Sequence, residues 1–151
     1  MHSTRRGRIR SEKGAELVEM AFVLPLFLLL IAGIVDFGFL LQGYLVSANA
    51  AREGARVAML PGYDADDYAA AKERVVDYFA SAGLTLDTDD VDVTEEDINL
   101  GSGDTANGVR VTVSYTHNFL LIGPIVGLMN LTFMDSLTYT TDAVMRTEVQ
   151  G

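Results

Sequence analysis

The longest apolar stretch of the chain lies near its N-terminus, where residues 20–35 read MAFVLPLFLLLIAGIV without a charge. Eleven of these sixteen residues are Leu, Ile, Val or Phe, which together favour membrane insertion by about 3–7 kcal/mol. As a helix the stretch rises about 24 Å, and continuing it to Leu41 lets it cross the roughly 30 Å of bilayer hydrocarbon. The pattern therefore predicts a transmembrane helix, with Asp36 as the one charge between residues 20 and 41.

Two other interpretations of this stretch are open. A buried core helix of a soluble protein has a similar pattern, but no other segment is apolar enough to cover it on all sides. A cleaved secretory signal is the second, because Ala48 and Ala50 resemble an A-x-A cleavage site. That site lies more than a dozen residues beyond the apolar run, so we expect the helix to stay in the membrane.

Helical periodicity continues beyond the apolar run over residues 44–60, until Pro61-Gly62 ends it. Small residues recur there at every fourth position and allow a second helix to approach closely. The two rows they form are Ser47, Ala51, Ala55 and Ala50, Gly54, Ala58. Candidate packing residues are therefore Ala51, Gly54 and Ala55, facing either a neighbouring subunit or the chain's own domain.

The C-terminal part contains one helical pattern followed by strand patterns. Apolar residues recur at helical spacing over residues 64–82, with Asp64 as the predicted cap and Gly83 as the predicted stop. The period then changes to two, which predicts strands at residues 91–93, 109–115 and 137–145, with the second preceded by a loop marked by Gly101, Gly103 and Gly108. We therefore expect an α+β fold, in which the long N-terminal helix extends into a small domain with one further helix on a short antiparallel sheet.

A second apolar stretch, FLLIGPIVGLMNL at residues 119–131, is too short to span a membrane. Gly123-Pro124 and Gly127 interrupt it. Two interpretations are open: a buried connection, or a patch that faces the membrane or another subunit.

Charge is divided unevenly along this chain of formal net charge -10. Five basic residues precede Gly14, whereas from Asp36 onward six Lys or Arg stand against 18 Asp or Glu. Basic residues beside an apolar helix stay in the cytoplasm, so the acidic part is predicted to lie outside. An acidic domain also argues against nucleic-acid binding, because phosphate contacts require a basic surface.

Candidate chemistry is sparse. The chain has no cysteine, so disulfides and thiolate catalysis are excluded. The acidic stretch at residues 87–92 departs from the EF-hand pattern, since Val91 takes the fifth place and no glycine follows. His2 and His117 are isolated in the sequence, and no nucleophile–base motif is recognisable. We therefore expect a protein that is not an enzyme and has no cofactor or metal.

The junction between the basic leader and the apolar run reads Lys13-Gly14-Ala15-Glu16-Leu17-Val18-Glu19-Met20. Without a side chain, Gly14 allows its backbone to enter a protease cleft closely. Glu19 is a carboxylate at the edge of a membrane segment, where such groups are costly and usually have a partner.

With these motifs the chain resembles type IV pilin-like precursors, and among them the TadE-like pseudopilins of tight-adherence (Flp-type) pili. In that group a basic leader ends in glycine, a glutamate follows at the fifth mature position, and a bulky residue comes next. The matching residues here are Gly14, Glu19 and Met20, followed by Pro25, Asp36-Phe37-Gly38 and Ala51-Arg52-Glu53-Gly54-Ala55-Arg56.

The resemblance implies a pilin-like fold and processing by a prepilin peptidase between Gly14 and Ala15. The new amine of Ala15 would pair with Glu19 of a neighbouring subunit. Implied partners are the peptidase, other pilin subunits, the pilus assembly platform and the membrane.

Three parts follow for the precursor: a basic leader at 1–14, a transmembrane and extended helix at 15–60, and an extracytoplasmic α+β domain at 61–151. The expected location is the bacterial inner (cytoplasmic) membrane, crossed once, and two fates are open: the protein stays there or is incorporated into an extracellular pilus. The alternative is a single-pass anchor that displays an acidic binding domain and does not enter a pilus.

Overall fold

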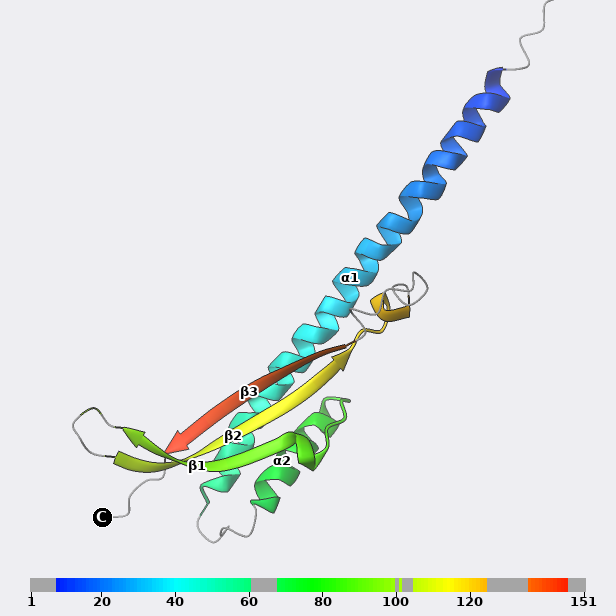
Figure 1. Ribbon diagram of the computed structural model, residues 1–151. Helices are drawn as coiled ribbons and strands as arrows, with labels where there is room; N and C mark the ends of the chain where they lie inside the picture. Colours follow the sequence, from blue (N-terminus) through cyan, green and yellow to red (C-terminus); the bar gives the residue numbers. More distant parts are fainter. Residues whose placement is uncertain (1–7, 61–67, 100, 102–104, 125–135, 147–151) are drawn as a thin grey trace, which may run out of the picture. The chain divides into compact units, whose positions relative to one another are not determined.

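The computed structural model describes residues 8–60, 68–99, 101, 105–124 and 136–146, with side chains from Gly14 onward. The described elements include helices α1 and α2, the 3₁₀ turn η1 (Thr88–Asp90) and strands β1, β2 and β3 (Figure 1). They belong to two compact units. Helix α1 up to Gly38 and the segment from Phe119 form the first, and α1 from Phe39, α2 and the sheet form the second. The predicted α+β fold is confirmed.

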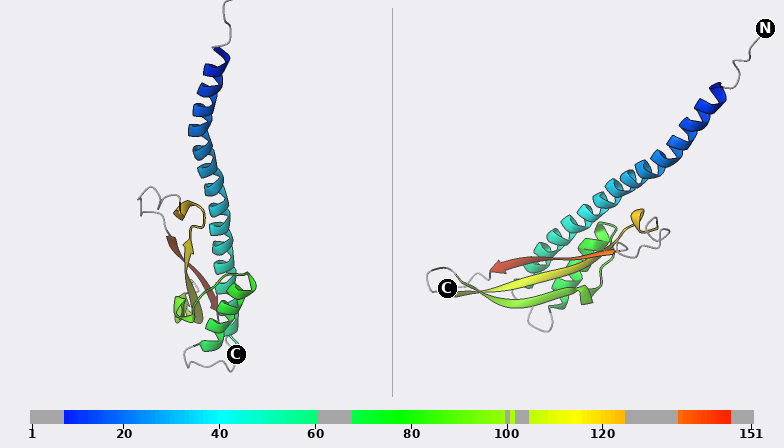
Figure 2. Two further views of the ribbon diagram at one scale, coloured as in Figure 1. Left: turned by 90° about the vertical axis from the view of Figure 1, so that its right-hand side faces the viewer. Right: turned by 45° about the horizontal axis from the view of Figure 1, so that its top comes forward.

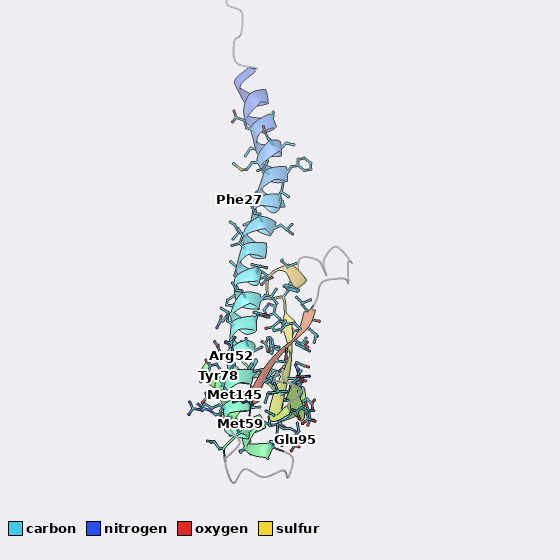
Figure 3. All side chains as sticks on the ribbon, turned by 90° about the vertical axis from the view of Figure 1, so that its left-hand side faces the viewer. Phe27, Arg52, Met59, Tyr78, Glu95 and Met145 are labelled. Carbon is cyan, nitrogen blue, oxygen red and sulfur yellow. The ribbon has the colours of Figure 1, made fainter. Side chains whose placement is uncertain are left out.

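Helix α1 spans Arg8–Ala58 without interruption and contains Pro25. It therefore starts inside the predicted leader. Its large apolar side chains between Leu17 and Phe39 are exposed, up to 79% for Phe22. Figure 3 shows Phe27 standing out from the ribbon in this part of the helix. The described chain leaves this stretch uncovered, so the interpretation as a buried core helix is wrong.

The sheet has the strand order β1-β2-β3, and both pairs are antiparallel (Figures 1 and 2). Strand β1 spans Val91–Asn99, β2 spans Thr105–Asn118 and β3 spans Ser136–Arg146. In the register, Val111 of β2 lies opposite Val93 of β1 and Ala143 of β3. The predicted strands are thus present, but β1 and β2 are longer than their period-two patterns indicated.

Gly108 corrects one expectation, because it lies inside β2 rather than in the loop before it. It pairs with Glu96 on one side and Arg146 on the other. A Cβ added at this position would lie 2.5 Å from Cδ1 of Ile98 and 2.9 Å from the carbonyl oxygen of Met145. The glycine is therefore explained by close approach of neighbouring strands rather than by a turn.

Helix α2 spans Ala69–Ser81, and its N-cap is Tyr68 in the left-handed region at φ 49. It begins later than predicted, and the proposed cap Asp64 lies outside the described residues. The C-terminal end follows the prediction. Gly83, at φ 74, donates to the carbonyl of Ala80, and Leu84 donates to that of Phe79. These bonds form a Schellman motif that satisfies the last carbonyls of the helix.

One core joins α1, α2 and the sheet within the second unit. Both helices pack on the same face of the sheet, as the valines at alternate positions of β2 are buried with them. The buried residues are Ala50, Ala51, Ala55, Ala58, Ala71, Val75, Phe79, Val91, Val109, Val111 and Val113. The C-terminal part of α1 therefore contributes small residues to the core of the chain's own domain.

Aromatic side chains extend the core along the sheet. The ring of Tyr115 lies 5.3 Å from that of Phe79 and 5.7 Å from that of Tyr139, and Tyr44 of α1 lies 5.8 Å from Tyr139. Burial raises the pKa of both Tyr115 and Tyr139, so these phenols stay neutral at physiological pH.

Helices α1 and α2 approach each other closely at Gly54. A Cβ added there would lie 2.5 Å from Cγ2 of Val75, 3.4 Å from the carbonyl oxygen of Ala71 and 3.5 Å from Cγ1 of Val111. Val75 and Val111 are fully buried and have no room to move aside. Only glycine therefore fits this crossing without displacing the core.

An ionic cluster lies on the other face of the sheet. Arg110 of β2 donates from Nε and Nη2 to the two carboxylate oxygens of Glu96 on β1, at 2.8 and 3.0 Å. Its Nη1 also donates to Asp142 of β3. One guanidinium thus links all three strands, and the Glu96 pair is of the bidentate kind.

We predict that Gly54→Ala lowers the free energy of unfolding by about 1–3 kcal/mol, because the added methyl group overpacks the core. In an exposed helix the same change usually stabilises, by about 0.8–1 kcal/mol. The measurement is denaturant unfolding of the full chain in detergent, followed by the near-ultraviolet dichroism of its tyrosines. Gly38→Ala is the matched control, since no atom of the described residues lies within 4 Å of a Cβ there. Equal stability of the two variants would contradict tight packing at Gly54.

A pH prediction follows from the ionic cluster. The hydrogen bonds from Arg110 hold the pKa of Glu96 below its ordinary value of 4.5. Its contribution to stability is therefore fully present above pH 4.5 and is lost as the pH falls through the lowered value. Glu96→Gln is expected to lower the thermal midpoint slightly at neutral pH, and the difference from wild type is expected to close in acid. Asp97→Asn, on the same strand, controls for removing an acid. A pH-independent difference would contradict this origin.

Candidate functional site at the two ends of the apolar helix

The predicted processing junction lies within α1 and is open to solvent. Gly14, Ala15, Glu19 and Met20 are all exposed. A Cβ added at Gly14 would meet nothing within 4 Å in the described part of the chain. The described fold therefore does not itself require glycine at this position, so any requirement would come from a protein that binds the junction.

The apolar stretch beyond the junction can span a membrane. Among the described residues, one helix is long and apolar enough, within the range 14–58 of α1. A core helix of a soluble protein also has this composition, but such a helix is mostly buried, whereas this one exposes its large side chains. The exposed apolar surface therefore favours a lipid environment.

The far end of the apolar run is marked by Asp36, whose side chain is fully buried. Its Oδ1 accepts hydrogen bonds from the backbone N–H groups of Leu120 and Leu121, both at 3.1 Å. Its Oδ2 accepts from Leu121 at 3.0 Å and from Ile122 at 2.7 Å. Residues 122–124 are helical, so the carboxylate lies at the start of a helical turn. A negative charge is favourable there, because the N–H groups of a first turn have no partner within the helix.

This contact offsets the free-energy cost of two kinds of unpaired polar group. A carboxylate taken out of water is costly unless hydrogen bonds compensate it. Unpaired backbone N–H groups next to a membrane are costly for the same reason. At Asp36 each group satisfies the other, and bonds from N–H groups to a carboxylate are stronger than neutral ones.

The segment that Asp36 holds packs along α1 but keeps apolar side chains outside. Cδ1 of Ile122 lies 3.9 Å from a Cβ added at Gly33, three residues before Asp36. Leu120 is 64% exposed and Leu121 is 38% exposed. The interpretation of residues 119–131 as a buried connection is therefore wrong for these two leucines, and residues 125–131 lie outside the described part.

The candidate packing residues Ala51, Gly54 and Ala55 are buried in the chain's own second unit. Their surfaces are covered by α2 and the sheet. Of the signature charges, Arg52 is exposed and donates to Asn49 at 3.2 Å, while Glu53 accepts from Arg74 of α2 at 3.0 Å.

Sequence reasoning missed two of these contacts. The Glu53–Arg74 pair joins two helices whose facing sides were unknown. The bonds of Asp36 join residues 84 to 86 positions apart. The only sequence signals were a charge directly after an apolar run and a second apolar run far along the chain.

Comparison with known proteins gives one match. Residues 14–56 match the model of the TadE-like protein family. No curated protein and no solved structure is significantly similar to the chain. The match begins at Gly14 and ends two residues before the end of α1. The predicted resemblance to TadE-like proteins is confirmed for this segment.

We predict that Asp36→Ala releases the segment from Leu120 onward, because three backbone N–H groups lose their acceptor. The measurement uses a Gly33→Cys, Ile122→Cys pair and a short thiol cross-linker, which is unambiguous in a chain without cysteine. Cross-linking is expected to be efficient with Asp36 and several-fold weaker with Ala. Glu19→Gln, which removes an exposed carboxylate from the same helix, is expected to change nothing. Unchanged cross-linking in Asp36→Ala would refute the role of this carboxylate.

Proposed function

We propose that this chain, with its TadE-like segment at residues 14–56, is the precursor of a minor pilin or pseudopilin of a tight-adherence (Flp-type) pilus. A prepilin peptidase cleaves it after Gly14. The product, which begins at Ala15, takes part in assembly of the pilus. The protein has a structural role and is not an enzyme.

The observation that carries the proposal is the TadE-like match over residues 14–56, which includes the predicted junction and the exposed apolar helix. The match starts at Gly14, the residue that sequence reasoning selected as the last of the leader. The five basic residues lie before it and the exposed apolar helix lies after it. This order supports a leader that is removed and a helix that remains in the membrane.

The proposed location is the bacterial inner membrane. Basic residues at one flank of a single span favour that flank in the cytoplasm. The leader is then accessible to a peptidase on the cytoplasmic side, and the acidic unit with α2 and the sheet lies outside the cell membrane. Other pilin subunits and the assembly platform are its proposed partners.

Glu19 is the proposed acceptor for the amine that cleavage creates. Four residues of helix separate it from Ala15, a rise of about 6 Å. The carboxylate is exposed in the isolated chain. A neighbouring subunit with its Ala15 amine at this level would neutralise a charge that is costly at a membrane edge.

The structure argues against a secretory signal cleaved near Ala50. Ala50 and Ala51 lie inside α1 and are fully buried in the core of the second unit. Cleavage there would cut the helix in the middle of its contact with α2 and the sheet.

The test is the mature N-terminus. The chain is expressed with and without a tight-adherence prepilin peptidase, and the product is sequenced. We expect a start at Ala15 that requires the peptidase and is lost in Gly14→Ala, while Gly7→Ala, in the same leader, is still cleaved. In a strain with the whole pilus system, Glu19→Gln is expected to be cleaved but not to co-purify with pilin subunits, and Glu16→Gln serves as its control.

Two outcomes would contradict the proposal. An intact N-terminus beside active peptidase would favour a static membrane anchor that displays an acidic domain. A start near Ala51 would mean a secretory signal and would remove the apolar helix from the mature protein.

A further inference from the structure

We infer that residues 119–124 form a second contact with the membrane, an apolar foot that Asp36 holds against the lipid at the end of the span farther from the leader. The partner is the boundary between acyl chains and headgroups. The inference rests on α1 spanning the membrane, as proposed above, but not on cleavage after Gly14.

The level of Asp36 along α1 is the first argument. The charge-free run ends at Val35, directly before it. From Glu19, at the edge of the membrane segment, to Asp36 a helix rises about 26 Å, which brings Asp36 close to the far boundary of a hydrocarbon core of roughly 30 Å. Because Leu120, Leu121 and Ile122 bond directly to the Asp36 carboxylate, the foot lies at this same level.

The surface of the foot is the second argument. Its six residues, Phe119 to Pro124, have no polar side chain. Leu120 and Leu121 point outward, and Phe37, the residue after Asp36, is 64% exposed. Exposed leucines beside a helix that faces lipid are suited to a segment that lies in the membrane interface.

The backbone of the foot is the third argument. A chain segment at the edge of the hydrocarbon must satisfy its N–H groups, since water is scarce there. The first N–H groups of the foot have no acceptor within their own helical turn. The Asp36 carboxylate accepts three of them, which makes the segment compatible with lipid contact.

The charge of Asp36 fits the same interpretation. An aspartate facing lipid would cost about 2.5–3.5 kcal/mol at the bilayer centre, and less toward the boundary. Here the foot covers the carboxylate completely, so α1 presents no bare charge to lipid at this level. The foot and the carboxylate are each suited to the membrane boundary only in the presence of the other.

The experiment measures the depth of single cysteines in the full chain. Bimane is attached at Leu120→Cys, Leu30→Cys or Val144→Cys, and the protein is reconstituted into vesicles of phosphatidylethanolamine and phosphatidylglycerol. Brominated acyl chains quench the dye where it touches lipid. The dye at position 30, on α1, reports whether the proposed transmembrane segment contacts lipid. The dye at position 144, an exposed residue of β3, reports whether the sheet does.

We expect Leu120→Cys to be quenched several-fold more strongly than Val144→Cys, and more by bromines near the headgroup than by bromines near the chain end. Adding Asp36→Ala, which removes the acceptor of all three N–H groups, is expected to abolish quenching at position 120 and to leave it unchanged at position 30.

The contrary outcomes are distinct. Quenching at position 30 without quenching at 120 would overturn the proposal that residues 119–124 contact lipid. It would still support α1 as a transmembrane helix. A blue-shifted but unquenched dye at 120 would mean a protein partner and would overturn the lipid assignment. Full quenching at 120 in Asp36→Ala would overturn the role of Asp36. Absence of quenching at position 30 would overturn the span, and with it the proposed function.

Discussion

The sheet unit depends on how closely α1 and α2 approach each other at Gly54. Val75 of α2 occupies the space that a methyl group at position 54 would need. The backbone of α1 therefore contacts a side chain of α2 directly at Gly54. The alanines on either side of Gly54 extend the contact along α1. The buried valines of β2 pack against both helices from the sheet. A core with so few large side chains depends on tight contact, because small residues bury little area each.

The first part of α1 differs from the part that packs in the sheet unit in the side chains it exposes. Between Leu17 and Phe39 it exposes large apolar side chains, and after Gly43 it turns small residues inward. The change from bulky to small residues along one helix therefore marks the change from lipid to protein as its surroundings. A consequence is that Ala51, Gly54 and Ala55 are not free for contact with another subunit.

Features that depend on a local pattern could be predicted from the sequence. Features that depend on contacts between segments far apart in the sequence could not. Local periodicity predicts the apolar run and strands β2 and β3. Local turn chemistry predicts that α2 ends before Gly83. Gly108 was assigned to a loop because its reason, the approach of Ile98 and Met145, belongs to neighbouring strands. Small residues at four-residue spacing predicted close packing but not its partner. The acceptor role of Asp36 was invisible, since nothing in the pattern links it to Leu120.

The separation between Asp36 and its donors also sets an order of events. The ribosome makes α1 long before it makes Leu120, 84 residues later. During that interval Asp36 has none of its three donors, and water must hydrate its carboxylate. Closing so long a loop requires that β1 and β2 be made first, and contacts of high sequence separation form late in folding. Asp36 therefore changes its surroundings from water to backbone N–H groups only after Leu120, Leu121 and Ile122 have been made.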